Sequence, residues 1–499
     1  INDGNWLPGA LRTAIAHFAD LFRAMDDPYL NARHEDIHHI GNKLYNTWRG
    51  DRALALPKGQ RIVLVGAQVS VSDIAAVPQG MLEGIVCFEG SSMSHTAVVA
   101  NALGVPAVMG TGPIRNLTVN CQLIVDGNQG EVIQSPTGSL LAEYRTLQND
   151  QRFLAKRLEK IRELPATSAD GVEVTLYTNT GLLADMSPGI FNGAQGVGLY
   201  RTEIPFMIRT SFPSEEEQVA VYTQVLAAYR GKPVHMRTLD VGGDKPLPYF
   251  PVENEANPAL GWRGIRFTLD NSQLLMTQVR AMIRAGSGTG NLRILLPMVS
   301  STGELDSFRE LLDDALTQLR SEGFEVKRPP LGVMVEVPAA ISQIPLWSGK
   351  LDFISIGSND LSQYLLALDR NNPRVAVRYD HVHPAVLLEI DRILRSAAAH
   401  NIPVSLCGEM ASDPVAVVLL LGLGLRTLSM SATRIPQIKW LIRTLTLDTA
   451  EQLSREALAC GYPADIRARV GKVLQAAGLG ELVNHSTLTD GDSLIAGAK

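Results

Sequence analysis

Two short apolar stretches, GVMVEV at residues 332–337 and DFISIG at 352–357, indicate how most of this 499-residue chain folds. Each has the length and the aliphatic content of a buried β-strand. Both belong to a series of eight such runs beyond Asp170: VEVTLYT (172–178), GVGLY (196–200), VHMRT (234–238), LRILLPMV (292–299), GVMVEV, DFISIG, PVSLC (403–407) and TLSMS (427–431). Helical stretches separate most of them, among them residues 215–230, 272–286, 303–322, 384–400 and 413–421. Eight buried strands alternating with helices predict a (β/α)8 barrel of the TIM type.

The carboxyl ends of these runs are mostly polar, and functional groups of such barrels lie at that end of the strands. In chain order the ends carry Asn179, Arg201, Arg237, Pro297–Met298, Glu336, Asn359–Asp360, Cys407–Glu409 and Ser429. Because arginines, carboxylates and a thiol converge on one face, we expect an active site there that binds an anion.

Four cations on or near these strands suit a phosphate, since guanidinium groups match phosphate oxygens in bidentate geometry. They are Arg201, Arg237, Lys245 and Arg263. The alternative interpretation is that the arginines only form ion pairs with Glu203 or Asp240. Their common place at the predicted barrel mouth favours an anion site.

Two carboxylates and one thiol complete the predicted site. Glu336 and Asp360 end neighbouring strands, so they could share one Mg²⁺ with substrate oxygens. Cys407 closes the seventh strand. Most buried cysteines are inert, but a thiol at the barrel mouth could also exchange a proton as general acid or base.

The first part of the chain shows other patterns. Residues 5–50 have helical spacing and predict two helices of a partial subdomain. Five short runs with strand character then predict a compact α/β domain that ends near Pro136: residues 61–66, 84–88, 97–100, 106–110 and 122–127. Residues 138–164 repeat apolar positions in steps of three, four or seven, which predicts a long amphipathic helix ending at Pro165.

His95 stands in the serine-rich loop of SSMSHTAVVANALGVPAVMG (91–110), at the start of an expected helix over 96–103. Free backbone N–H groups at a helix N-terminus favour an attached phosphate, and a neutral imidazole can act as a nucleophile. A histidine in such a turn is more often a cap or a solvent-facing residue, so only its context favours a functional role.

Composition excludes several classes of protein. A formal charge of −6 gives no electrostatic reason to expect nucleic acid or a membrane surface as partner. Four widely spaced cysteines indicate neither a disulfide framework nor a zinc site, which suits the cytoplasm. The longest apolar run, near 415–425, is too short to span a bilayer, and the chain begins with Ile1 without a signal-peptide pattern.

Seven motifs together resemble Enzyme I of the phosphoenolpyruvate:sugar phosphotransferase system over residues 55–475. They are GSSMSHTAVVA (90–100), GVGLYRTE (196–203), MRTLDVGGDKPLPY (236–249), NPALGWRGIR (257–266), MVEVPAA (334–340), DFISIGSNDLSQYLLALDRNN (352–372) and LCGEMASDP (406–414). YRTEIPFM and SMSHTAVVA are most similar to the nitrogen-related branch, whose members carry a GAF domain upstream that is not part of this chain. The resemblance implies a phosphoenolpyruvate-protein phosphotransferase with Mg²⁺ as cofactor and a histidine phosphocarrier protein (HPr-like) as acceptor, in sugar uptake or nitrogen regulation.

The resemblance also implies roles for individual residues. His95 would be phosphorylated, Arg201 and Arg237 would bind the phosphate, and Cys407 would protonate the enolate to give pyruvate. Glu336 and Asp360 would hold Mg²⁺, Asn359 and Arg370 would bind the substrate, and Arg263 and Lys245 would support them. Ser70 stands where the family has a threonine that hydrogen-bonds the active histidine, a mild departure.

The resemblance further implies five segments and a homodimer formed through the barrel. The segments are a partial helical subdomain (1–54, a remnant of the phosphocarrier-docking part), a swivelling phosphohistidine domain (55–137), a linker helix (138–165), a phosphoenolpyruvate-binding barrel (166–476) and a tail (477–499). Two alternatives stay open. One is a fragment of a pyruvate phosphate dikinase or phosphoenolpyruvate synthase without its ATP-grasp domain, and the other is a non-catalytic phosphoenolpyruvate-sensing module.

Overall fold

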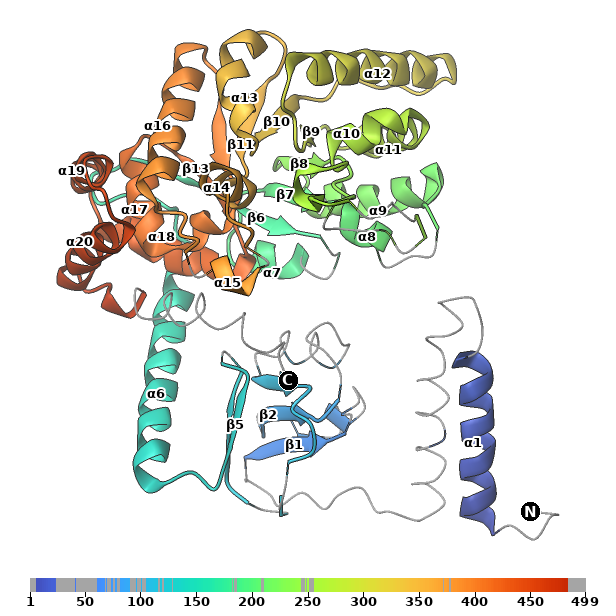
Figure 1. The fold of residues 1–499 in the computed structure, drawn as a ribbon, viewed down its shortest axis with the longest axis vertical. Coiled ribbons are helices and arrows are strands. Elements are labelled where there is room, and N and C mark those ends of the chain that lie inside the picture. Colours follow the sequence, from blue (N-terminus) through green and yellow to red (C-terminus); the bar gives the residue numbers. More distant parts are fainter. Residues whose placement is uncertain are drawn as a thin grey trace. The chain divides into compact units, whose positions relative to one another are not determined.

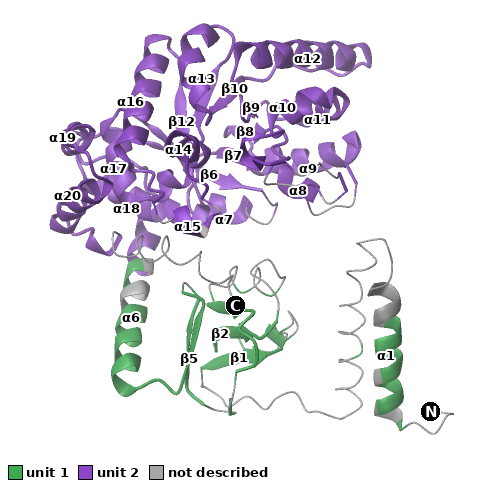
Figure 2. Ribbon diagram, viewed as in Figure 1, with its two compact units in different colours: residues 1–154, 488–496 green, residues 155–487, 497–499 purple. Residues whose placement is uncertain are grey.

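A computed structural model of the chain describes residues 6–23, 41, 61–67, 69, 73–74, 77–78, 81–89, 96, 100, 105–114, 117–118, 121–127, 129–181, 183, 186–207, 211–243, 247, 249–250, 255–370, 372–376 and 378–482. The chain divides into two compact units, residues 1–154 with 488–496 and residues 155–487 with 497–499 (Figure 2). Each unit is described by itself.

The first unit contains a small parallel sheet in the order β1-β2-β3 and an antiparallel hairpin of β4 and β5. Its elements are α1 (Leu7–Arg23), β1 (Ile62–Gly66), β2 (Leu82–Cys87), β3 (Ala107–Met109), β4 (Leu123–Asp126), β5 (Glu131–Gln134) and α6 (Gly138–Ile161), of which residues 155–161 belong to the second unit. Ile85 and Cys87 of the middle strand are almost fully buried and form the core of this sheet with Ala100.

The structure confirms some of the elements predicted for this region. The long helix expected over 138–164 is α6, and four of the five expected strands are present. The run at 97–100 is not a strand where it is described, because Thr96 and Ala100 are helical. The predicted second helix before residue 50 lies outside the described residues, except Gly41, which is helical.

The second unit is a closed barrel of parallel strands in the order β10-β11-β12-β13-β6-β7-β8-β9, which confirms the predicted fold (Figure 1). The strands are β6 (Thr175–Thr180), β7 (Val197–Arg201), β8 (Val234–Arg237), β9 (Leu292–Leu296), β10 (Leu331–Val335), β11 (Phe353–Ile356), β12 (Val404–Leu406) and β13 (Thr427–Met430). Every residue of β8, β10 and β11 is buried, as expected where helices cover the outside of a barrel filled with side chains.

Helices surround the barrel, with α9, α11 and α12 along one part of it and α16, α17, α19 and α20 along another (Figure 1). They are α7 (Met186–Phe191), α8 (Glu203–Met207), α9 (Glu215–Ala228), α10 (Ile265–Asp270), α11 (Ser272–Gly286), α12 (Thr302–Ser321), α13 (Pro338–Gln343), α14 (Ser358–Leu366), α15 (Pro373–Ala376), α16 (Pro384–Ala399), α17 (Pro414–Gly422), α18 (Ile435–Thr444), α19 (Leu447–Leu458) and α20 (Pro463–Ala476). Short 3-10 turns lie at Pro258–Leu260, Ile344–Trp347, Glu409–Ser412 and Ala432–Arg434. None of the helices in the described residues is long and apolar enough to cross a membrane.

Local sequence explains where several of these helices begin. Ser214 and Ser301 cap α9 and α12, and in each case a glutamate three residues later completes a capping box. Asp413 caps α17, and Pro414 follows it at the first helical position. The five helices expected from spacing are α9, α11, α12, α16 and α17, each within two residues of the expected bounds.

The end of α6 from residue 155 and the segment after it contact α18 of the barrel. The Arg157 guanidinium lies 4.2 Å from the centre of the Trp440 ring. Lys439 Nζ donates to the Arg162 carbonyl at 2.5 Å, and Arg443 donates to the Pro165 carbonyl at 2.8 Å. The chain therefore enters the barrel unit through a fixed segment.

Candidate functional site

The barrel brings the predicted residues that lie in it to the carboxyl ends of its strands. Arg201 and Arg237 are the last residues of β7 and β8, Glu336 follows β10, and Cys407 follows β12. The others lie at the same end. Asn179 is near the end of β6, Arg263 precedes α10, Asn359 and Asp360 are in the first turn of α14, and Arg370 follows that helix. His95, Ser70 and Lys245 lie outside the described residues.

Arg237 is held by two carboxylates, and its side chain is only 5% exposed. Its Nη2 donates to Glu203 Oε1, and its Nη1 lies 3.0 Å from Asp240 Oδ2. Burial alone lowers the pKa of a guanidinium, but the two carboxylates outweigh burial and raise the pKa of Arg237. The group is thus a permanent positive charge with a fixed orientation.

A chain of charges continues from Asp240 across the mouth. Arg263 Nη2 lies 3.2 Å from Asp240 Oδ2, and Arg263 Nη1 lies 3.7 Å from Asp360 Oδ1. Arg370 Nη2 approaches the same Asp360 oxygen at 4.0 Å. Arg201, by contrast, is exposed, and its side chain forms no hydrogen bond or ion pair with another described residue. The mouth therefore combines arginines held by carboxylates with one available to a ligand.

Glu336 is buried within this charged cluster, at 1% exposure. Its Oε1 accepts a hydrogen bond of 2.7 Å from the Met298 backbone N–H, and Met298 has a φ of 59°, which is uncommon for a residue with a side chain. Burial, followed by the charges of Asp360 and Asp240, raises the pKa of Glu336 above its ordinary range. A buried carboxyl group whose ionisation is opposed by two other carboxylates would be stabilised in its charged form by a bound cation.

Cys407 is also buried, and its Sγ donates weakly to the Ile356 carbonyl at 3.6 Å. Burial is the main reason that the pKa of its thiol is raised to about 11. The thiol therefore keeps its proton at neutral pH. The backbone of Cys407 is also bonded to β6, since Asn179 donates to the Cys407 carbonyl at 2.8 Å. Asn179 in turn accepts from Ser429 Oγ at 2.6 Å, so these bonds connect the end of β12 with the paired strands β13 and β6.

Asn359 is held by two neighbours. It exchanges two hydrogen bonds with Glu409, donating at 3.0 Å and accepting from the Glu409 backbone at 2.9 Å. The Tyr379 hydroxyl donates to the Asn359 carbonyl at 3.2 Å. The sequence analysis did not identify Tyr379, because this residue lies far along the sequence from the end of any strand.

The pairing of Arg237 with Glu203 and Asp240 was predicted as an alternative to an anion site. The structure shows that the pairing exists, and that it lies at the mouth. Ion pairing and ligand binding therefore do not exclude each other here, because the carboxylates orient a guanidinium that still faces the site's other charges.

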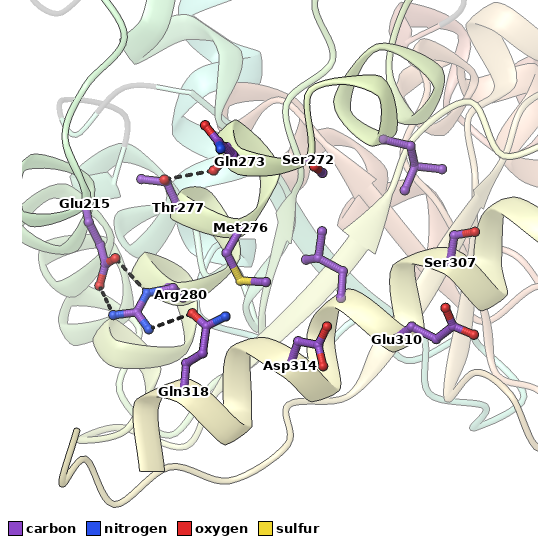
Figure 3. A pocket seen from close by; sticks show the side chains of 12 residues that line it. Glu215, Ser272, Gln273, Met276, Thr277, Arg280, Ser307, Glu310, Asp314 and Gln318 are labelled. Carbon is purple, nitrogen blue, oxygen red and sulfur yellow. Dashed lines mark hydrogen bonds and ion pairs between the residues drawn. The ribbon is translucent and has the colours of Figure 1, made fainter. Parts of the chain in front are cut away.

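One groove lies away from the mouth, on the outer surface between α11 and α12, with a volume of about 720 Å³ (Figure 3). Met276 and Leu311 are among its apolar residues. Arg280 on its wall is already engaged, with Nε 2.8 Å from Glu215 Oε2 and Nη1 donating to Gln318 at 3.3 Å (Figure 3). Its lining contains none of the predicted site residues.

The residues predicted to hold Mg²⁺ are the two carboxylates Glu336 and Asp360. Within the described part of the chain, no three histidine, cysteine, aspartate or glutamate side chains gather as a metal site. Mg²⁺ is usually held by one or two carboxylates together with substrate oxygens and water, so Glu336 and Asp360 are enough to fit it.

Comparison with known families gives two matches. Residues 58–130 match the family described as PEP-utilising enzyme, mobile domain, and residues 155–447 match PEP-utilising enzyme, PEP-binding domain. A solved structure described as the N-terminal domain of Enzyme 1 - Nitrogen is 33% identical and covers 30% of this chain and 60% of its own, with a TM-score of 0.21.

Among curated proteins, the "Phosphoenolpyruvate-dependent phosphotransferase system" protein of Escherichia coli is 42% identical over 97% of this chain and 65% of its own length. The protein of the same name from Salmonella typhimurium is 41% identical over 95% of this chain and 63% of its own. This chain thus spans slightly less than two thirds of either. The phosphoenolpyruvate-protein phosphotransferase of Staphylococcus carnosus is 37% identical, over 92% of this chain and 80% of its own length. The chain therefore belongs to the PEP-utilising enzymes and, among them, to the family of phosphoenolpyruvate-protein phosphotransferases, or Enzyme I.

Proposed function

We propose that the protein transfers the phosphoryl group of phosphoenolpyruvate to its own His95, releases pyruvate, and then passes the group to an HPr-like histidine phosphocarrier. The observation that carries this proposal is the buried Arg237, fixed at the barrel mouth by Glu203 and Asp240. Phosphoryl transfer depends mainly on positioning and on charge stabilisation, which a preorientated guanidinium supplies.

In this proposal the arginines divide the substrate between them. Arg201 and Arg237 bind the phosphate, and Arg370 binds the carboxylate together with Asn359. Arg263, buried between Asp240 and Asp360, supports the phosphate side electrostatically, and we assign Lys245 to the same task. The available guanidinium of Arg201 suits a residue that meets the ligand directly.

The charges at the mouth favour a metal in addition to these arginines. Among the described residues of the mouth, the carboxylates of Glu203, Asp240 and Asp360 offset much of the charge of Arg237, Arg263 and Arg370, and a bound cation would favour the ionised form of Glu336. A multiply charged anion then needs further positive charge. We propose that Glu336 and Asp360 hold Mg²⁺, which when bound would neutralise substrate oxygens as a Lewis acid.

The chemistry balances with groups of this chain. The bond between phosphorus and the enol oxygen breaks as a phosphorus–nitrogen bond forms to neutral His95. The electrons remain on the enolate, whose terminal carbon takes the proton of the Cys407 thiol to give the methyl group of pyruvate. A thiol with a pKa near 11 is protonated before the reaction and regains its proton from water afterwards.

The domain assignments complete the proposal. Residues 55–137 form the swivelling phosphohistidine domain, 138–165 the linker helix, and 166–476 the substrate-binding barrel, with residues 1–54 as part of the carrier-docking subdomain and 477–499 as a tail. His95 must then visit the barrel mouth and the carrier in turn. We further propose a homodimer through the barrel and a cytoplasmic location.

Single-turnover release of pyruvate tests the function. With phosphoenolpyruvate, Mg²⁺ and no nucleotide, we expect one pyruvate per chain, and His95→Ala should release none while binding phosphoenolpyruvate as tightly in calorimetry. A requirement for ATP or AMP would instead support the dikinase alternative. Binding without pyruvate release by the wild-type chain would support the sensing module.

A further inference from the structure

A buried chain of hydrogen bonds lies behind the ends of β7 and β8. It links Thr202, Gln278, Tyr222 and Gln218, whose exposures are 0%, 0%, 1% and 4%. Thr202 follows β7, Gln278 lies on the buried face of α11, and the other two lie on α9. Thr202 belongs to the GVGLYRTE motif, whereas Gln218, Tyr222 and Gln278 lie outside the quoted motifs, and none of the four was predicted as a site residue.

The donor and the acceptor of each hydrogen bond in this buried series can be assigned without ambiguity. Gln218 Nε2 donates to the Pro213 carbonyl at 3.0 Å, so its Oε1 accepts from the Tyr222 hydroxyl at 3.1 Å. The Thr202 hydroxyl donates to the Arg237 carbonyl at 2.7 Å. Both hydroxyl protons are thereby used, and each hydroxyl oxygen can only accept from Gln278.

Gln278 satisfies all of these demands at once. Its Nε2 donates to Thr202 Oγ1 and to Tyr222 Oη, both at 3.2 Å. Its Oε1 accepts from the Leu239 backbone N–H at 2.9 Å. A buried polar group left without a partner is costly, so an amide in this orientation is required at position 278.

The two segments that Gln278 joins carry the charged residues of the mouth. Thr202 stands between Arg201 and Glu203, while Leu239 directly precedes Asp240. The Thr202 hydroxyl adds a direct link from the first segment to the backbone of Arg237. The spacing of the two arginines that meet the phosphate thus depends on a side chain of α11.

We propose that Gln278 and Thr202 are positioning residues that set the distance between Arg201 and Arg237 for binding the phosphoryl group. This inference rests on the proposed function, because it concerns affinity for phosphoenolpyruvate. If the hydrogen-bonded series were only structural, removing any of its hydrogen bonds would lower stability. Removing a bond near the arginines would then affect phosphoenolpyruvate binding no more than removing a distant one.

Matched variants separate the two roles. Thr202→Val keeps the shape and removes the hydroxyl, Thr202→Ser restores it, and Tyr222→Phe removes a hydroxyl at the far end of the same chain. Gln278→Met removes the link from the helix side and serves as a second variant should Thr202→Val not fold. The readouts are the Kd of phosphoenolpyruvate with Mg²⁺ by calorimetry, single-turnover pyruvate release, and Tm.

We expect Thr202→Val and Gln278→Met to weaken phosphoenolpyruvate binding about tenfold, the loss that follows from one buried hydrogen bond in the site's support. Thr202→Ser should bind within about twofold of wild type, and Tyr222→Phe should lower Tm while binding within about twofold. Wild-type affinity in Thr202→Val or Gln278→Met, or equal weakening in Tyr222→Phe, would overturn the inference. If the wild-type chain itself neither binds phosphoenolpyruvate nor releases pyruvate, the proposed function fails instead.

Discussion

Two arginine clusters in the barrel use the same chemistry in different surroundings. The mouth cluster contains Arg237 and Arg263 with the carboxylates of Glu203, Asp240 and Asp360. The outer cluster, between α9, α11 and α12, contains Arg280 and Arg284 with Glu215, Glu216 and Glu322. The mouth carboxylates are 10% exposed or less, whereas the outer carboxylates range from 21% exposed at Glu215 to 45% at Glu322 and 74% at Glu216.

The two clusters both contain several ion pairs, so they differ mainly in how far their charged side chains are buried. Exposed pairs are screened by water and contribute about 1 kcal/mol or less to stability. Buried charges interact strongly, and removing one partner leaves the other uncompensated. The mouth cluster therefore fixes charges in place for a ligand, while the outer cluster holds helices together.

The largest effect should come from removing the central charge of the mouth cluster. We expect Arg237→Met to slow single-turnover pyruvate release by about 10³-fold, since it removes the oriented cation that we propose binds the phosphate. Arg280→Met is the matched control, and it should leave the rate within about twofold because its pairs lie on the outer surface. Equal losses in both variants would erase the distinction between the clusters.

The second largest effect should come from Cys407, whose thiol is buried at the barrel mouth. We expect Cys407→Ala to lower pyruvate release by about 10²-fold while the Kd for phosphoenolpyruvate stays unchanged, because the proton donor acts after binding. With its pKa raised to about 11, the thiol stays protonated, so its contribution to the rate should hold from pH 7 to about 10 and fall above that. The rate of pyruvate release is measured against pH in the wild type and in Cys407→Ala. A fall in rate near pH 8 that is present in the wild type and absent from Cys407→Ala would contradict this.

A third charged cluster tests the role of burial without the substrate. Asp413 Oδ2 lies 2.9 Å from His381 Nε2 and 2.7 Å from Arg467 Nη1, and it is 3% exposed. Asp413→Asn should keep the cap of α17 but leave Arg467 without this buried partner, lowering the free energy of unfolding by about 3 kcal/mol. Denaturant unfolding measures this, with the exposed Glu451→Gln as a control that should change it little.

The same residue predicts a pH dependence. Burial alone raises the pKa of Asp413, but His381 and Arg467 outweigh burial, and the folded pKa lies below that of the unfolded chain. A lowered folded pKa means that the stabilisation is complete above about pH 4 and is lost as the pH falls through the folded value. Asp413→Asn should therefore flatten the acid side of the stability profile, and an unchanged profile would count against this pairing.

The smallest effect belongs to the outer cluster. Arg284→Gln removes contacts of 2.7 Å to Glu215 and to Glu216, yet we expect it to lower the free energy of unfolding by less than about 1 kcal/mol. The difference from wild type should shrink further in 1 M salt, because exposed charges are screened. A loss as large as that of Asp413→Asn would show that exposure does not rank these clusters.

The fold and most of the mouth could be predicted from sequence because both depend on local patterns. Apolar runs such as GVMVEV identify strands, and the rule that barrel sites lie at strand ends then places Glu336 and Cys407. Ala100, the described residue of the run expected as a strand at 97–100, is helical, since short apolar runs fit a helix equally well. Gln278 and Tyr379 could not be found, because each acts through a contact between segments far apart in the chain.

The central claim is that the barrel mouth loads His95 from phosphoenolpyruvate. The most direct measurement is incubation with phosphoenolpyruvate labelled in its phosphate, Mg²⁺ and no nucleotide, followed by peptide mapping of the acid-labile label. The account predicts a single phosphohistidine at position 95, absent from His95→Ala and strongly reduced in Arg237→Met but not in Arg280→Met. A folded wild-type chain that takes up no label, or takes it up at another residue, would contradict the account.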